Sequence, residues 1–213
     1  MAISPENSND VYHTIAHQAT FEMKERGSRF IATAMPVDSR ARAEAHIQDI
    51  QTTYYDATHN CFAYRTGMAS QEVSRFNDDG EPSGTAGKPI LQAILGRELT
   101  NVLIVVTRYF GGTKLGTGGL IRAYGGAAVR VLEQADIRHY YLTQTLHVEC
   151  PYAAQPVIAM ALDAFKATIV NSEFTDRVQY RIAVRQRQVS AFVDYVKNQS
   201  SGQITPEIID TDR

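Results

Sequence analysis

The sequence predicts an α+β protein of two domains, with the boundary between residues 141 and 142. The chain has 213 residues, enough for two domains of about 100 residues that each bury a core. Strand-like and helix-like runs are mixed throughout its length. After residue 142 these runs follow the order β-α-β-β-α-β, with the last strand expected over residues 204–211, and this is the ferredoxin-like arrangement. We therefore expect a first domain over residues 1–141 and a ferredoxin-like domain over residues 142–213.

Composition excludes several classes of protein. With 44% hydrophobic and 21% charged residues, the chain is expected to be globular. No apolar run approaches the roughly 20 residues that span a bilayer, and the start of the chain has no signal-peptide pattern. The two cysteines, Cys61 and Cys150, form no disulfide framework and are expected to be free, buried thiols. These features predict a cytoplasmic protein without membrane association.

The first domain begins with a predicted hairpin and a predicted helix. Residues 13–37 are expected to form two strands around a turn at residues 26–28. Asp38 is expected to cap a helix over residues 38–54. The helical positions expected to face the core are Ala41, Ala45 and Ile47 to Ile50.

Further along, residues 60–67 form a β-type run. Its alternation places Cys61 and Ala63 on one face and Phe62 and Tyr64 on the other. Three later elements follow from apolar runs of the appropriate period: a short helix over residues 89–97, a strand over 101–110 and a long helix over 118–135.

Residues 77–88 form a long polar segment rich in glycine. A connection of that length is more often functional than merely connective. Its carboxylates could bind a divalent ion or exchange protons, but Asp-Asp-Gly-Glu-Pro is also ordinary turn chemistry, which we favour. A serine in Pro-Ser-Gly-Thr does not match the nucleophile elbow of hydrolases. The candidate site residues of this segment are Asp78, Asp79, Glu81, Ser83 and Thr85.

A second glycine-rich segment spans residues 108–126 and holds seven glycines directly behind an apolar strand. It fails the phosphate-loop pattern because Lys114 precedes Gly116 and is followed by leucine. It also fails the dinucleotide fingerprint, since the third glycine is missing. What remains is the amino end of a helix, whose free N–H groups attract anions. In mid-helix, Gly125 and Gly126 are expected to permit close packing of the helix on the sheet.

Charge supports an anion site in this region. Residues 101–132 contain four basic side chains and no acidic one, in a chain whose net charge is −2. Any nucleic-acid binding must therefore use a local patch, although scattered cations that merely solvate a helix remain an alternative. The residues predicted to bind an anion or nucleic acid are Lys88, Arg108, Lys114, Thr117, Gly118, Gly119 and Arg122.

His59 and Cys61 point to one face of a strand and could supply two metal ligands. A zinc site requires three or four, and no companion pair occurs at ligand spacing. We expect a packed cysteine beside a hydrogen-bonded histidine. The sequence predicts no metal, no cofactor and no catalytic residue.

Four stretches carry a family resemblance. NDDGEPSGTAGKPIL and VTRYFGGTKLGTGGLIRAYG, preceded by GSRFIATA and HNCFAYR, resemble the IMPACT/YigZ family over residues 15–140. The second half is similar to the C-terminal domain of bacterial members. The resemblance implies a first domain of the ribosomal protein S5 domain 2-like fold, as in domain IV of elongation factor G. The ferredoxin-like half would resemble domain V of that factor. No settled catalytic residues come with the family.

The resemblance and the local charge together predict an RNA- or ribosome-associated binding protein that modulates translation. The expected partner is RNA or the ribosome, or alternatively a protein, without DNA specificity. A second hypothesis is a small-molecule, hydrolase-like enzyme with an anion- or metal-binding pocket between residues 77–88 and 108–119. A third is a protein adaptor with a broad apolar patch.

Overall fold

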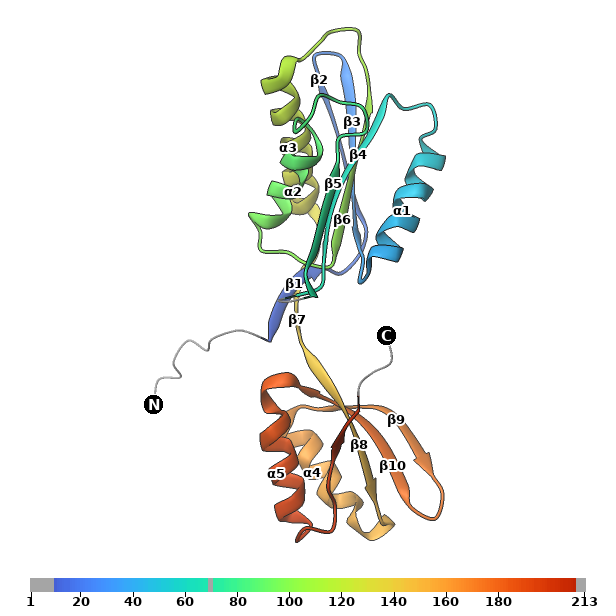
Figure 1. The fold of residues 1–213 in the computed structure, drawn as a ribbon, viewed down its shortest axis with the longest axis vertical. Helices are drawn as coiled ribbons and strands as arrows, with labels where there is room; N and C mark the ends of the chain where they lie inside the picture. Colours follow the sequence, from blue (N-terminus) through green and yellow to red (C-terminus); the bar gives the residue numbers. More distant parts are fainter. Residues whose placement is uncertain (1–9, 69–70, 210–213) are drawn as a thin grey trace, which may run out of the picture. The chain divides into compact units, whose positions relative to one another are not determined.

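The computed structural model describes residues 10–68 and 71–209 and consists of two compact units (Figure 1). The first unit comprises residues 12–140, and the second comprises residues 141–209 with Asp10 and Val11. Asp10 belongs to the second unit because its carbonyl accepts the Leu142 N–H at 2.7 Å. Its carboxylate also lies 3.3 Å from Arg187.

The first unit is a five-stranded antiparallel sheet in the order β2-β3-β6-β4-β5. Helix α1 covers one face, and α2 and α3 cover the other (Figure 1). A separate two-stranded sheet pairs β1 with β7. The strands are β1 (Val11–Ile15), β2 (Ala19–Glu25), β3 (Ser28–Pro36), β4 (His59–Thr66), β5 (Val73–Asn77), β6 (Val102–Tyr109) and β7 (Ile137–Tyr141). The helices are α1 (Arg40–Thr53), α2 (Gly87–Leu95) and α3 (Gly116–Gln134).

Alternation along the central strands separates the two cores, as the sequence predicted for β4. Cys61 and Ala63 enter the core beneath α2 and α3, whereas Phe62 and Tyr64 enter the core beneath α1. Strand β6 is buried on both faces, which explains its continuous apolar run. Strands β5 and β7 were not predicted, and the single strand expected before the turn at residues 26–28 is divided into β1 and β2. Strand β5 is exposed along its whole length, and β1 and β7 have only five residues each, so none carries a clear apolar period.

Two expectations for α1 were wrong. Ser39, not Asp38, is the N-cap, and its hydroxyl accepts the Arg42 N–H at 3.4 Å. Asp38 instead pairs with the Arg42 guanidinium at 2.9 Å. The buried positions are Ala43 and Ile47, while Ala41 and Ala45 are exposed.

The packing role expected for the mid-helix glycines was also wrong. A Cβ on Gly125 would meet Pro89 of α2 at 3.5 Å, which is ordinary contact with a helix and not with the sheet. A Cβ on Gly126 would have nothing within 4 Å. Neither glycine is therefore required by close packing.

The second unit confirms the ferredoxin-like prediction. Its sheet is antiparallel in the order β11-β8-β10-β9, and α4 and α5 lie on one face (Figure 1). The elements are β8 (Thr143–Cys150), α4 (Gln155–Phe165), β9 (Thr168–Phe174), β10 (Val178–Arg185), α5 (Val189–Gln199) and β11 (Glu207–Ile208). The last strand, predicted over residues 204–211, is shorter, and residues 210–211 lie outside the described chain. Among the described residues, no helix has the length and apolar character that a membrane span requires.

Candidate functional site

The site begins with the register of three strands. Phe30 of β3 and His59 of β4 are the direct cross-strand partners of Arg108 in β6. Arg108 continues the row of Ile104 and Val106, both of which lie in the core beneath α2 and α3. Its side chain therefore lies on the face of the sheet that α2 and α3 cover, near the end of β6.

A buried ion pair occupies this position. Arg108 Nη1 donates to Glu81 Oε1 at 2.5 Å, and Nη2 donates to the Ser28 hydroxyl at 3.2 Å. The two side chains are only 6% and 4% exposed. Tyr124 of α3 also donates to Glu81 Oε1 at 2.7 Å. A buried ion pair is tolerated only when additional hydrogen bonds offset the loss of hydration, and Ser28 and Tyr124 provide them.

The neighbouring carboxylates satisfy backbone groups. The Asp78 carboxylate accepts the N–H groups of Gly84, Ala86 and Gly87 at 2.8, 2.9 and 2.8 Å, and so caps α2 from a distance. Asp79 accepts the Asn60 N–H at 2.6 Å. These contacts fit the turn interpretation of this segment, because both carboxylates complete the hydrogen bonding of the chain around them.

The remaining polar residues of residues 77–88 differ in exposure. The Thr85 hydroxyl is buried and donates to the Pro82 carbonyl at 2.6 Å. Ser83 and Lys88 are exposed. Within this segment, Glu81 is thus the carboxylate that joins the buried network around Arg108.

The second glycine-rich segment is held against the β2–β3 turn. Arg26 and Gly27 have φ of 46° and 83°, as a tight two-residue hairpin turn requires. The Gly111 N–H donates to the Ser28 hydroxyl at 3.2 Å. A Cβ on Gly111 would lie 1.9 Å from the Gly27 carbonyl carbon. Glycine is therefore dictated at position 111 by the approach of two backbones.

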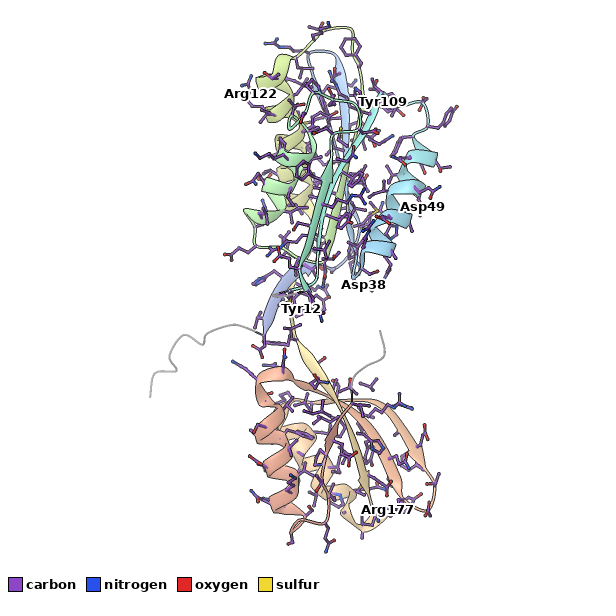
Figure 2. All side chains as sticks on the ribbon, viewed as in Figure 1. Tyr12, Asp38, Asp49, Tyr109, Arg122 and Arg177 are labelled. Atoms are coloured by element: carbon purple, nitrogen blue, oxygen red, sulfur yellow. The ribbon has the colours of Figure 1, made fainter. Side chains whose placement is uncertain are left out.

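A cavity of about 340 Å³ opens above the ion pair. Residues from both glycine-rich segments line it: Glu81, Pro82, Arg108, Phe110, Lys114, Leu115, Gly116, Thr117 and Leu120. A second cavity of about 210 Å³ shares Leu115 and is lined by Met23, Glu25, Arg26, Gly119, Arg122 and Ala123. In Figure 2, Arg122 on α3 and Tyr109 on β6 lie at the same end of the first unit.

The amino end of α3 reaches the first cavity. The helix begins at Gly116, has no side-chain cap and has no acidic residue in its first turn. Lys114, Gly116, Thr117 and Gly118 are exposed. Free N–H groups and the helix dipole favour an anion at such an end.

The structure brings together four of the predicted site residues and separates the others. Those that share the first cavity are Glu81, Arg108, Lys114 and Thr117. Gly119 and Arg122 line the second cavity, and Lys88 and Gly118 line neither.

In the folded chain, acidic side chains from outside residues 101–132 offset half of the positive charge of that segment. Glu81 neutralises Arg108 from another segment. Arg130 lies 3.2 Å from Glu133, one residue beyond the window of residues 101–132. Lys114 and Arg122 are the other two cations of that window, and both are exposed.

Sequence reasoning missed two aromatic residues of the site. Tyr124 follows Leu120 by four positions on the buried face of α3, and a buried hydroxyl needs a partner. Phe110 is an aromatic residue inside a polar glycine loop, and the residue is 47% exposed. The helical spacing of Tyr124 and the aromatic character of Phe110 in a polar loop could therefore have identified both residues from the sequence.

His59 and Cys61 have the structural surroundings expected of them. His59 Nδ1 donates to the Asp79 carbonyl at 2.7 Å, and the Cys61 thiol donates to the Asp78 carbonyl at 3.0 Å. Across residues 10–68 and 71–209, no three His, Cys, Asp or Glu side chains gather as a metal site. Burial raises the pKa of the Cys61 thiol from 9.0 to about 12.

Cys61 is expected to resist alkylation in the folded protein and to lower stability at high pH. In the unfolded chain the thiol loses its proton near pH 9, whereas the folded chain holds it until about pH 12. The unfolded state is therefore increasingly favoured between these values. Urea titrations at pH 8, 9.5 and 11 should show a steeper loss of stability for the wild type than for Cys61→Ala. Parallel curves, or rapid labelling by iodoacetamide at pH 8, would contradict this expectation.

Taken together, the fold and the site define a two-unit α+β protein whose first unit holds a cavity between a buried ion pair and an uncapped helix end. Residues 26–132 match the Impact N-terminal domain, and residues 148–203 match a domain of unknown function, DUF1949. The chain belongs to the IMPACT family.

Relatives match over most of the chain. The IMPACT family member YvyE of Bacillus subtilis (strain 168) is 34% identical over 191 residues, covering 90% of this chain and 88% of its own length. The IMPACT family member YigZ of Escherichia coli (strain K12) is 34% identical over 179 residues, covering 83% and 87% respectively. A crystal structure described as that of a hypothetical protein aligns with a TM-score of 0.69 at 30% identity. That alignment covers 95% of this chain and 99% of the other.

Proposed function

We propose that this protein binds RNA or the ribosome in the cytoplasm through the amino end of α3, and thereby modulates translation. The observation that carries the proposal is an uncapped, acid-free helix end with the exposed Lys114 beside it. Phosphate groups bind such ends through backbone N–H groups and the helix dipole. The resemblance to translation-factor domains motivates the ribosome as the RNA-rich partner.

The cations near this end favour a polyanion over a single small anion. Arg26 and Arg122 line the second cavity, which adjoins the first through Leu115. Lys114 lies on the first cavity, so positive charges flank Leu115 on two sides. Glu25 also lines the second cavity and offsets part of this charge. Spaced cations along a surface suit successive phosphates of a nucleic-acid backbone.

Lys114→Ala is expected to weaken RNA binding by about 1 kcal/mol, roughly fivefold, because it removes one charge-assisted phosphate contact. The slope of binding against salt should also fall by about one. Fluorescence anisotropy with a labelled single-stranded RNA at 50 and 200 mM KCl would measure both. The matched control is Arg130→Ala, whose side chain already pairs with Glu133 and lies about 21 Å along α3 from Gly116 at 1.5 Å per residue. The proposal would be contradicted if the protein did not bind RNA at 50 mM KCl, or if its RNA affinity did not fall as the salt concentration rose. Equal losses of RNA affinity in Lys114→Ala and Arg130→Ala would also contradict it.

A small-molecule function is the second candidate, favoured by one observation. This function requires residues 77–88 and residues 108–119 to lie next to each other. They do so, because Glu81 and Arg108 are in contact and line one cavity. The cavity volume of about 340 Å³ falls within the range of ligand pockets, about 300–1,000 Å³. A rise in melting temperature with inorganic phosphate, without any RNA affinity, would favour this candidate over the first.

A further inference from the structure

We propose that the cavity above the Glu81–Arg108 pair holds one unpaired nucleobase of the bound RNA. This inference rests on the proposed function and specifies what the cavity recognises. The walls of the cavity are apolar and come from Pro82, Leu115, Leu120 and the ring of Phe110. Such walls suit a flat, largely apolar group, and a phosphate would gain nothing from them.

The floor of the cavity offers a carboxylate oxygen that the hydrogen bonds of Glu81 leave free. The polar neighbours of Glu81, namely Arg108 and Tyr124 by hydrogen bonds and His59 at 3.8 Å, all approach Oε1. Oε2 is then the acceptor available to a ligand. Arg108 also lines this cavity, and its terminal nitrogens already donate to Glu81 and Ser28.

An unpaired base matches this pattern. Each of the four bases carries a hydrogen-bond donor on its Watson–Crick edge, which complements the free oxygen of the Glu81 carboxylate. In a duplex that edge is occupied by the partner base. Phe110 is a half-exposed residue, and its aromatic ring provides a stacking surface for the face of the base. Its centroid lies 5.5 Å from Arg108 Cζ, so the stacking surface adjoins the polar floor.

The distribution of charge in the cavity determines the orientation in which a nucleotide binds. The floor pair is neutral overall, and the Glu81 carboxylate would repel a phosphate placed beside it. The rim of the same cavity carries Lys114, Gly116 and Thr117 at the start of α3. A nucleotide therefore enters with its base toward Glu81 and its phosphate toward the helix end.

The test compares two five-unit probes against the full chain at 50 mM salt: a single-stranded RNA and an abasic ribose-phosphate strand of equal charge. The RNA is expected to bind about tenfold more tightly, because one stacked base contributes on that order. Phe110→Ala should remove most of this difference and leave the abasic affinity unchanged. Phe174→Ala, which alters an exposed phenylalanine of the second unit, is the matched control and should bind both probes like the wild type. A self-complementary duplex should bind no better than the abasic strand.

The outcomes separate this inference from the function on which it rests. Equal affinity for both probes that Lys114→Ala weakens would overturn the base pocket and retain phosphate binding. An RNA advantage that survives Phe110→Ala would equally overturn the pocket. Absence of binding by either probe would overturn both proposals.

Discussion

Replacing Gly111 by alanine is expected to destabilise the first unit by about 3 kcal/mol, the upper range for forcing extra atoms into a packed site. The added Cβ would lie 1.9 Å from the Gly27 carbonyl carbon and 2.2 Å from the Ser28 backbone nitrogen. Both are backbone atoms, so no side-chain rotation relieves the clash. The β2–β3 turn must move, and the bond from Gly111 N–H to the Ser28 hydroxyl is lost with it.

Urea unfolding followed by far-ultraviolet circular dichroism would measure this effect, since the chain contains no tryptophan. Gly126→Ala is the matched control, because the added Cβ meets nothing within 4 Å. In a helix interior, this change should raise stability by up to about 1 kcal/mol. Similar stabilities for Gly111→Ala and the wild type would show that the hairpin does not constrain the glycine loop.

Arg108→Ala is expected to destabilise the first unit by about 3–5 kcal/mol, because it leaves the Glu81 carboxylate buried without its counter-charge. The cost follows from burial, since the two side chains are 6% and 4% exposed. Arg122→Ala serves as the control: its side chain is exposed, and its loss should change stability by no more than about 0.5 kcal/mol. Denaturant titration of both variants measures the difference.

A double-mutant cycle tests whether the cost belongs to the pair. Glu81→Ala and Arg108→Ala should each destabilise strongly, and the double variant should cost clearly less than their sum. Additive costs would mean that the two charges are stabilised independently. Lys114→Ala separates folding from binding, because it should bind RNA weakly while remaining as stable as the wild type.

The buried pair changes how the cations of the glycine-rich segment are understood. In the sequence, Arg108 follows a strong strand and precedes a glycine loop, the usual setting of an exposed anion-binding residue. The register of β3, β6 and β4 instead places it between Phe30 and His59, on the face of the sheet that α2 and α3 cover. Its charge is balanced by Glu81, 27 residues earlier in the chain. Lys114 therefore carries the electrostatic part of the proposed site.

The sequence by itself determined the α+β class, the ferredoxin-like order of the second half and the two faces of β4. These follow from local periodicity, because alternation along a strand and the order of apolar runs are set by the nearest neighbours in the chain. The sequence also marked the two glycine-rich segments as unusual. It could not reveal that Glu81 meets Arg108, that Asp78 caps α2, or that Gly111 lies against Gly27. The contacts of Glu81 with Arg108 and of Gly111 with Gly27 join residues that are distant in the chain, and only the pairing of strands brings them together. The bonds of Asp78 lie within one segment, and the folded conformation of that segment decides them.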